Sequence, residues 1–200
     1  MKKIRFSIIV FLLFTFICSC THNYTPKPRG YYRFDFPEKK YQILNFNYPY
    51  SFEYPVYGKA LADTDKNAEP YWMNIEFNKF QAKIYLSYKP LKNNVDKFIE
   101  DAHTLAYNHT VKADAIELSM VGDAKRKVYG IIYDIKGNAA SSVQFYMTDS
   151  VHNFLMGSLY FNCSPNKDSL DPAIRYFRQD ILHLIETLHW KQAVKSSDLH

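Results

Sequence analysis

The sequence predicts an α+β fold, a single domain in which two helices pack on an antiparallel sheet. Three observations lead to this prediction. Apolar residues alternate with polar ones in six segments, at the period of half-buried strands, and recur at helical spacing in two others. Turn-forming residues separate consecutive strand segments, which favours hairpins and antiparallel pairing. Residues 31–190 supply enough chain for one continuous core.

The first 19 residues are expected to be a cleaved signal peptide that precedes this domain. A basic start with Lys2, Lys3 and Arg5 is followed by an apolar run from Phe6 to Ile17 and a short stretch of small residues. The run holds about 12 residues, whereas a membrane-spanning helix needs about 20. Cleavage is therefore the better interpretation of residues 1–19.

The junction Ile17-Cys18-Ser19-Cys20 resembles the lipobox that lipoprotein signal peptidase recognises. The resemblance implies that Cys20 becomes the first residue of the mature chain, with a thioether-linked diacylglycerol and an acylated amino terminus. Several acyl chains make a durable anchor, because each buried methylene contributes about 0.8 kcal/mol. The alternative is an ordinary signal peptide cut nearby, which would leave Cys20 free.

Removing the signal also removes most of the apparent basicity. Lys plus Arg falls from 25 to 22 against 20 Asp plus Glu. A net charge near +2 gives no reason to expect nucleic acid or anionic lipid as a partner. Once Cys18 is cleaved off and Cys20 is lipidated, only Cys163 is left, so no intrachain disulfide can form. Cys163 ends an apolar strand pattern and is expected to be a buried structural thiol.

Two segments lead into the predicted sheet. Residues 20–30 contain Pro26 and Pro28 and are expected to form a lipidated tether, about 35 Å long at most when extended. Residues 31–57 are rich in Tyr and Phe, with prolines among them. We favour edge strands and ordered loops that cover the sheet. The alternative is a partner-binding or glycan-stacking aromatic face.

The first hairpin and the first helix follow. Residues 71–77 and 82–88 alternate as two strands, with Asn78 to Gln81 as their turn. From Asn94 to His109 the apolar residues change to helical spacing, and Asn94 is the expected N-cap.

Four strands are expected next, over residues 115–121, 127–135, 141–148 and 153–162, with turns at Gly122-Asp123, Gly137-Asn138 and Asp149-Ser150. The third of them alternates apolar residues with Gln144, Tyr146 and Thr148, which predicts a solvated strand face. We therefore expect the sheet to be covered mainly on one side.

A second helix is expected to close the domain. Asp171 is its predicted N-cap, Pro172 its first residue, and an apolar stripe continues to Leu188. Residues 191–200 are expected to form a frayed tail. The order strand pair, helix, four-strand meander, helix resembles that of the Mog1/PsbP-like superfamily, in which helices pack on an antiparallel sheet. An element order of this kind does not give function.

No motif with a specific catalytic mechanism occurs, so we expect no enzyme, no cofactor and no metal. Glu186 and His189 form E-x-x-H, but a di-iron bundle needs a second such motif and two further carboxylates, so a surface pair is favoured. The run from Lys125 to Lys127 is expected to be a solvated hairpin tip.

Two short segments, Asp149-Ser150-Val151 and Asp168-Ser169-Leu170, resemble the O-glycosylation site of exported proteins in Bacteroidota, an aspartate followed by Ser or Thr and an apolar residue. Ser150 and Ser169 are therefore possible O-glycosylation sites. So short a pattern also occurs by chance, about half a match in a chain of ordinary composition.

Several blocks of the mature chain are similar to the gliding motility lipoprotein GldD family of Bacteroidota: residues 26–31, 36–39, 84–90, 108–114, 128–130, 137–140 and, most specifically, Gln144 to Val151. The family implies a cell-envelope lipoprotein required for gliding and associated with type IX secretion. It has no established catalytic residues, so only Cys20 carries over, as the lipidation site. Residues 21–26 lack the acidic cluster of surface-exposed lipoproteins, which favours a periplasm-facing domain. The outer membrane is the expected location rather than the inner.

These features favour a non-enzymatic component or assembly factor of the gliding and type IX secretion machinery, binding other envelope proteins through the aromatic segment or an exposed sheet face. The alternative is a periplasmic lipoprotein that binds peptidoglycan or another glycan, with Trp72 and nearby tyrosines as stacking surfaces. An enzyme would require titratable groups that converge in a cleft.

Overall fold

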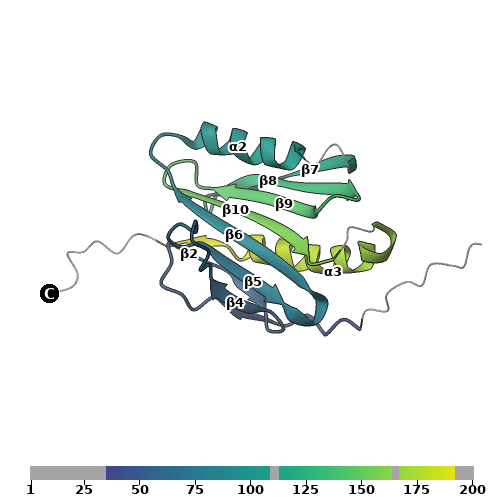
Figure 1. The fold of residues 1–200 in the computed structure, drawn as a ribbon. Coiled ribbons are helices and arrows are strands. Elements are labelled where there is room, and N and C mark those ends of the chain that lie inside the picture. The colour runs from purple at the N-terminus through teal and green to yellow at the C-terminus, as the bar shows by residue number, and fades with distance from the viewer. Residues whose placement is uncertain (1–34, 109–112, 164–166, 192–200) are drawn as a thin grey trace, which may run out of the picture. The chain divides into compact units, whose positions relative to one another are not determined.

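The computed structural model describes residues 35–108, 113–163 and 167–191. The expected signal peptide, Cys20 and the tether lie outside these residues. The domain is built on a seven-stranded antiparallel sheet with the order β4-β5-β6-β10-β9-β8-β7 (Figure 1). Its strands are β4 (Lys59–Ala62), β5 (Met73–Phe77), β6 (Ala82–Pro90), β7 (Ala113–Asp123), β8 (Val128–Gly137), β9 (Ser141–Thr148) and β10 (Asn153–Phe161).

The predicted hairpins are present. β5 and β6 pair around the short 3-10 helix η1 (Asn78–Phe80), and β7 to β10 form the four-strand meander. Pairing of β10 with β6 joins the two parts into one sheet. The edge strand β4, which pairs with β5, was not predicted, because four residues are too few to show a period.

The two helices are α2 (Val95–Tyr107) and α3 (Lys167–Glu186). They confirm the prediction of an antiparallel α+β domain with two helices. They cover opposite faces of the sheet: Tyr133 and Phe154 pack in the cluster under α2, whereas Ile132 and Leu155 pack in the cluster that contains α3 (Figure 1). The expectation of a sheet covered mainly on one side is therefore wrong.

The strand β9 shows why that expectation fails. All eight of its residues are buried, including Gln144, Tyr146 and Thr148, which were predicted to face solvent. The ring of Tyr146 stacks on Phe154 with their centroids 5.2 Å apart, beneath α2. A Tyr ring is mostly apolar, so an alternating pattern that contains it can be covered on both faces.

Both helix starts differ in detail from the prediction. Asn94 occupies the N-cap position of α2, but its side chain makes no capping bond, and its Oδ1 accepts a hydrogen bond from Lys92 N at 2.7 Å. α3 begins at Lys167, so Asp171 and Pro172 lie inside it rather than at its start. Pro172 is the sixth residue of α3 and has no N–H to donate to the carbonyl one turn earlier, and Asp171 forms an ion pair with Arg175 one turn later.

The aromatic segment forms two small ladders separate from the main sheet. β1 (Tyr41–Ile43) pairs with β3 (Glu53–Pro55), and β2 (Tyr50–Ser51) pairs with β11 (His189–Trp190) after α3. Tyr50 and Phe52 are fully buried in the core with α3. The described part of this segment therefore covers the core, as favoured, although its strands are not edges of the main sheet.

Lys191, expected at the start of the tail, extends the β2–β11 ladder. Its backbone N donates to Pro49 O at 2.8 Å, and its Nζ donates to Phe46 O at 3.1 Å. Residues 192–200 lie outside the described part of the chain.

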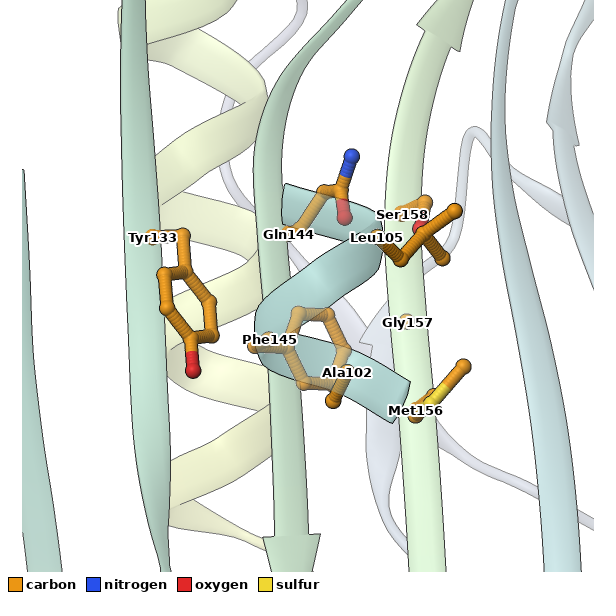
Figure 2. Close-up of a pocket in the computed structure, with 8 residues that line it drawn as sticks. All are labelled: Ala102, Leu105, Tyr133, Gln144, Phe145, Met156, Gly157 and Ser158. Carbon is orange, nitrogen blue, oxygen red and sulfur yellow. The ribbon is translucent and has the colours of Figure 1, made fainter. Parts of the chain in front are cut away.

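A small cavity lies between α2 and the sheet, lined by eight residues that include Ala102, Tyr133 and Gln144 (Figure 2). Its volume is about 10 Å³, which is no more than one water molecule occupies. The polar ends of Tyr133 and Gln144 point in opposite directions (Figure 2), so they do not converge on a common ligand. This space is a packing defect under α2 rather than a binding site.

Candidate functional site

The part of the sheet that α2 does not cover presents a polar and aromatic surface, which we call the open sheet face. In β5, Met73, Ile75 and Phe77 turn toward α3, so the intervening Asn74 and Glu76 turn to the other side. The same alternation places further residues of β6 and β10 beside them. The open sheet face consists of Trp72, Asn74, Glu76, Lys83, Tyr85 and Tyr160.

Two shallow depressions meet on this face. One, of about 570 Å³, lies over β5, β6 and β10 and reaches Tyr160; the other, of about 530 Å³, lies between β4, β5 and the loop before Trp72. Both are lined by Glu76, Lys83 and Tyr85. The three shared residues lie where the two depressions adjoin, and we call the two depressions together the groove.

An ion pair lies at the centre of the groove. Glu76 and Lys83 face each other across β5 and β6, and Lys83 Nζ lies 2.8 Å from Glu76 Oε1. The hydrogen bond to Glu76 raises the pKa of the Lys83 ammonium above its usual value, despite some desolvation. Lys83 Nζ also lies 5.2 Å from the centroid of the Tyr85 ring, and Tyr85 meets Tyr160 edge to face at 5.5 Å. These contacts hold a cation between an acid and an aromatic pair.

Trp72 and Asn74 form the other end of the groove. Trp72 Nε1 donates to Tyr88 O at 3.0 Å, which fixes the indole, and Lys89 Nζ lies 5.0 Å from its ring centroid. Asn74 is 8% exposed, and its Oδ1 has no hydrogen-bond partner among the described residues. A buried acceptor without a partner costs about 1–3 kcal/mol of folding stability. The Asn74 side chain is therefore an unsatisfied polar group at this end of the groove.

A second cluster of charged and phenolic groups binds the aromatic segment to α3. The carboxylate of Asp180 is fully buried and accepts hydrogen bonds from Lys39 Nζ at 2.7 Å, Tyr57 OH at 2.6 Å and Tyr41 OH at 3.0 Å. Lys39 Nζ also donates to Tyr176 O at 2.8 Å and lies 3.2 Å from the Tyr176 ring centroid. We call these five residues the Asp180 cluster.

Desolvation dominates the electrostatics of the Asp180 cluster. Burial lowers the pKa of the Lys39 ammonium, and the hydrogen bond to Asp180 and its charge only partly oppose this effect. Burial also raises the pKa of the Tyr57 hydroxyl, and its hydrogen bond to Asp180 raises that pKa further. Every polar group in the cluster is thus committed to a neighbour, which suits a structural lock rather than acid–base chemistry.

The structure corrects two of the predicted roles. Cys163 is exposed, so it is not the buried structural thiol that was expected. Arg126 is not part of a solvated tip, because its Nη1 donates to Ile185 O at 2.9 Å and to Leu188 O at 3.1 Å. Arg126 therefore caps the carboxyl end of α3, where a cation is favoured.

No group of three or more His, Cys, Asp or Glu side chains able to hold a metal occurs within the described ranges. Glu186 is the last residue of α3, and His189 begins β11, where its Nδ1 lies 2.6 Å from Thr187 O. The two residues of the E-x-x-H pattern therefore belong to different elements.

Ser150 lies at the turn between β9 and β10. It is exposed and has a left-handed φ of 68°, and its neighbour Asp149 organises the turn. Asp149 Oδ1 accepts hydrogen bonds from the backbone N of Val151, His152 and Asn153 at 2.7–2.9 Å. Ser169 lies in α3 and is half-buried. Of the two, Ser150 is the more accessible position.

Sequence reasoning missed the central pair of the groove, although a signal for it exists. Glu76 and Lys83 stand just outside the predicted turn of the first hairpin, one residue further from it than Phe77 and Ala82. Antiparallel register therefore requires them to face each other. By contrast, the contact of Lys39 with Asp180 spans 141 residues and has no local signal.

The described chain is thus an α+β domain with a helix on each face of an antiparallel sheet, and it offers a shallow polar and aromatic sheet face. The family model described as gliding motility lipoprotein GldD matches residues 21–190, and the chain belongs to this family. A family of lipoproteins implies attachment to a membrane through lipid. None of the helices in the described residues is long and apolar enough to cross a membrane.

Among solved structures, the chain is similar to the solution structure of cyanobacterial PsbP (CyanoP) from Synechocystis sp. PCC 6803. The sequence identity is 11%, the TM-score is 0.48, and the match covers 80% of this chain and 97% of that one. No curated protein sequence matches the chain.

Proposed function

We propose that this lipoprotein is a non-enzymatic component or assembly factor of the gliding and type IX secretion machinery, and that it binds another envelope protein through the open sheet face. The observation that carries the proposal is the groove around Glu76, Lys83 and Tyr85, which α2 leaves uncovered. Family membership supports the link to gliding motility. The link to secretion and the direct partner are part of the proposal.

The character of the groove favours a protein partner over a small molecule. Small-molecule sites are lined mainly by apolar side chains and enclose most of their ligand, whereas both depressions here are only half enclosed and are lined mainly by polar residues. Protein interfaces are enriched in aromatic side chains and surround them with polar groups. Tyr85 is 40% exposed, and Tyr160 and the Glu76–Lys83 pair flank it. In the aromatic segment the described Tyr and Phe rings are all less exposed than Tyr85, so the sheet face is the better interface of the two.

The same proposal places the domain in the envelope. Residues 1–19 act as the signal peptide, Cys20 carries the lipid, and residues 20–30 tether the domain on the periplasmic side of the outer membrane. Ser150 and Ser169 remain possible O-glycosylation sites, and the exposure of Ser150 supports the first of them.

Variants of the groove test the proposed binding. In a deletion strain complemented with Lys83→Ala/Tyr85→Ala, we expect loss of spreading and loss of co-purifying envelope proteins at unchanged lipoprotein abundance. The control is Ile43→Ala, which removes a side chain that is 69% exposed on the aromatic segment. Normal spreading of the double variant would refute the proposal. Assaying secretion in the same strains separates the two roles, since lost spreading with intact secretion would restrict the protein to motility.

A glycan is the second candidate ligand, because Trp72 lines the groove beside a buried acceptor without a partner. One ring face of Trp72 is engaged by Lys89, which leaves a limited stacking surface. Sedimentation with purified peptidoglycan decides between the candidates. Binding that is lost in Trp72→Phe would favour the glycan, and absence of sedimentation would exclude it.

A further inference from the structure

The strand β7 forms a long free edge of the sheet. It spans eleven residues and pairs only with β8 in the described structure. Natural proteins protect edge strands by making them short or by adding charged side chains, especially lysine, as well as proline or bulges. The opposite edge, β4, follows this rule, since it has four residues and begins with Lys59. In β7 the irregularity lies at the start, between Ala113 and Ala115, and the acidic residues leave the stretch from Leu118 to Gly122 without any charge.

Apolar side chains lie exposed along this edge. Leu118 is 51% exposed and Met120 is 89% exposed, and both lie on the face of the sheet that α2 covers further along. Tyr129 of β8, which is 38% exposed, faces Gly122 of β7 beside them. Such a combination of a free edge and apolar side chains is a template for adding another strand.

Two of the acidic side chains on β7 already have partners within the chain. Glu117 Oε2 lies 3.4 Å from Lys136 Nζ, and Asp123 Oδ2 lies 2.8 Å from Arg126 Nε. An incoming strand therefore does not have to supply cations for them. Because these two acids are already paired, the incoming strand can be one without basic residues, such as β7 of a second copy.

Two copies of β7 can pair with each other as antiparallel strands with compatible residues face to face. When two copies run antiparallel over Ala115 to Val121, the regular part of β7, the pairing is centred on Leu118. Facing residues then share a side of the sheet. Leu118 faces Leu118 of the second copy, Ile116 faces Met120, and Glu117, the acid within this part of the strand, faces Ser119.

We infer that β7 is a self-association surface, pairing with β7 of a second copy of this chain about a two-fold axis at Leu118. The contact is isologous, so it closes at a dimer and leaves no further β7 edge free. It joins two seven-stranded sheets edge to edge and covers Leu118 and Met120 in both copies. It uses no residue of the open sheet face, so it stands independently of the proposed partner binding.

Cysteine crosslinking of the full-length lipoprotein in its own envelope tests both the pairing and its register. Facing Cα atoms of antiparallel strands lie about 4.5–5.5 Å apart, within the range that a disulfide spans. In a Cys163→Ser background, Leu118→Cys should form a covalent dimer of this chain under mild oxidation. The matched control is Met120→Cys, whose side chain is more exposed but whose two copies would lie about 14 Å apart in this register.

The expected result is a dimer yield at least tenfold higher for Leu118→Cys than for Met120→Cys. Replacing Leu118 by Lys should shift the detergent-solubilised lipoprotein from dimer to monomer without altering its circular dichroism. The inference is overturned if Met120→Cys crosslinks as well as Leu118→Cys, or if neither crosslinks. Crosslinking of Leu118→Cys to a different protein would also overturn it, because the edge would then accept a foreign strand.

Discussion

Replacing Asp180 by alanine should destabilise the domain more than the loss of any solvent-exposed carboxylate. Its carboxylate has no exposed surface and accepts three hydrogen bonds, from Lys39, Tyr41 and Tyr57. Without it, the ammonium of Lys39 loses its counter-charge and is left with neutral partners, Tyr57 OH and Tyr176 O.

The magnitude follows from the burial of the two partners. Breaking a buried ion pair by removing one member costs about 3–5 kcal/mol. The side chain of Lys39 is 24% exposed, so water can partly replace the lost carboxylate, and the cost should lie near the lower end. We expect a loss of about 3 kcal/mol, which for a domain of this size lowers the Tm by about 6–12 °C.

Urea and thermal unfolding of the mature domain measure this loss, with Asp171→Ala as the matched control. Asp171 pairs with Arg175 on the same helix, but both side chains are well exposed, so the control should lose at most about 0.5 kcal/mol. Replacing both Lys39 by Met and Asp180 by Leu should recover part of the stability, since neither charge is then left buried. Equal losses in Asp180→Ala and Asp171→Ala would refute this account of the cluster.

Three further predictions concern the β-turn, the sheet and the end of α3. Burial acts to raise the pKa of Asp149, but backbone and side-chain hydrogen bonds outweigh it and lower the pKa below its usual value. The ionised Asp149 carboxylate therefore stabilises the folded domain fully above about pH 4. This contribution is lost as the pH falls through the lowered pKa that Asp149 has in the folded state. Asp149→Asn should lose about 1–2 kcal/mol at pH 7, with a smaller loss in urea titrations at pH 3; an equal loss at both pH values would contradict this. Gly157→Ala places a Cβ 2.1 Å from Phe145 Cζ, so it should lose about 1–3 kcal/mol, and adding Phe145→Leu should restore part of it. Failure of that rescue in a double-mutant cycle would count against the contact. Arg126→Ala should lose about 1–2 kcal/mol in the same assay, whereas Lys125→Ala should stay within about 0.5 kcal/mol of wild type.

The elements that follow from local sequence were predicted well. The apolar alternation of β5, β6 and the meander is set by the period of a strand, and the stripes of α2 and α3 by the period of a helix, so each could be recognised without knowledge of the rest. Which faces of the sheet are covered could not be predicted from the sequence, because this depends on where each helix lies in space. Gln144 and Tyr146 look solvated in sequence and are buried in the structure because α2 crosses above them.

The candidate site was predictable only in part. Trp72 was named from the sequence as a stacking surface for a glycan, and the register of the first hairpin implies the pairing of Glu76 with Lys83. The burial of Asp180 under Lys39 and the capping of α3 by Arg126 depend on contacts between residues far apart in the chain. A single sequence carries no local pattern for such contacts, so the expectation of a solvated hairpin tip holds for Lys125 and Lys127 but is wrong for Arg126.

The central claim is that the open sheet face binds a protein of the gliding or secretion machinery. A photo-crosslinking amino acid introduced at Tyr85 in living cells tests it most directly, with the same probe at Val151, a residue 57% exposed outside this face, as the control. We expect the probe at position 85 to capture a motility or secretion protein and the probe at position 151 to capture none. Capture of the same proteins from both positions, or of none from position 85, would contradict it.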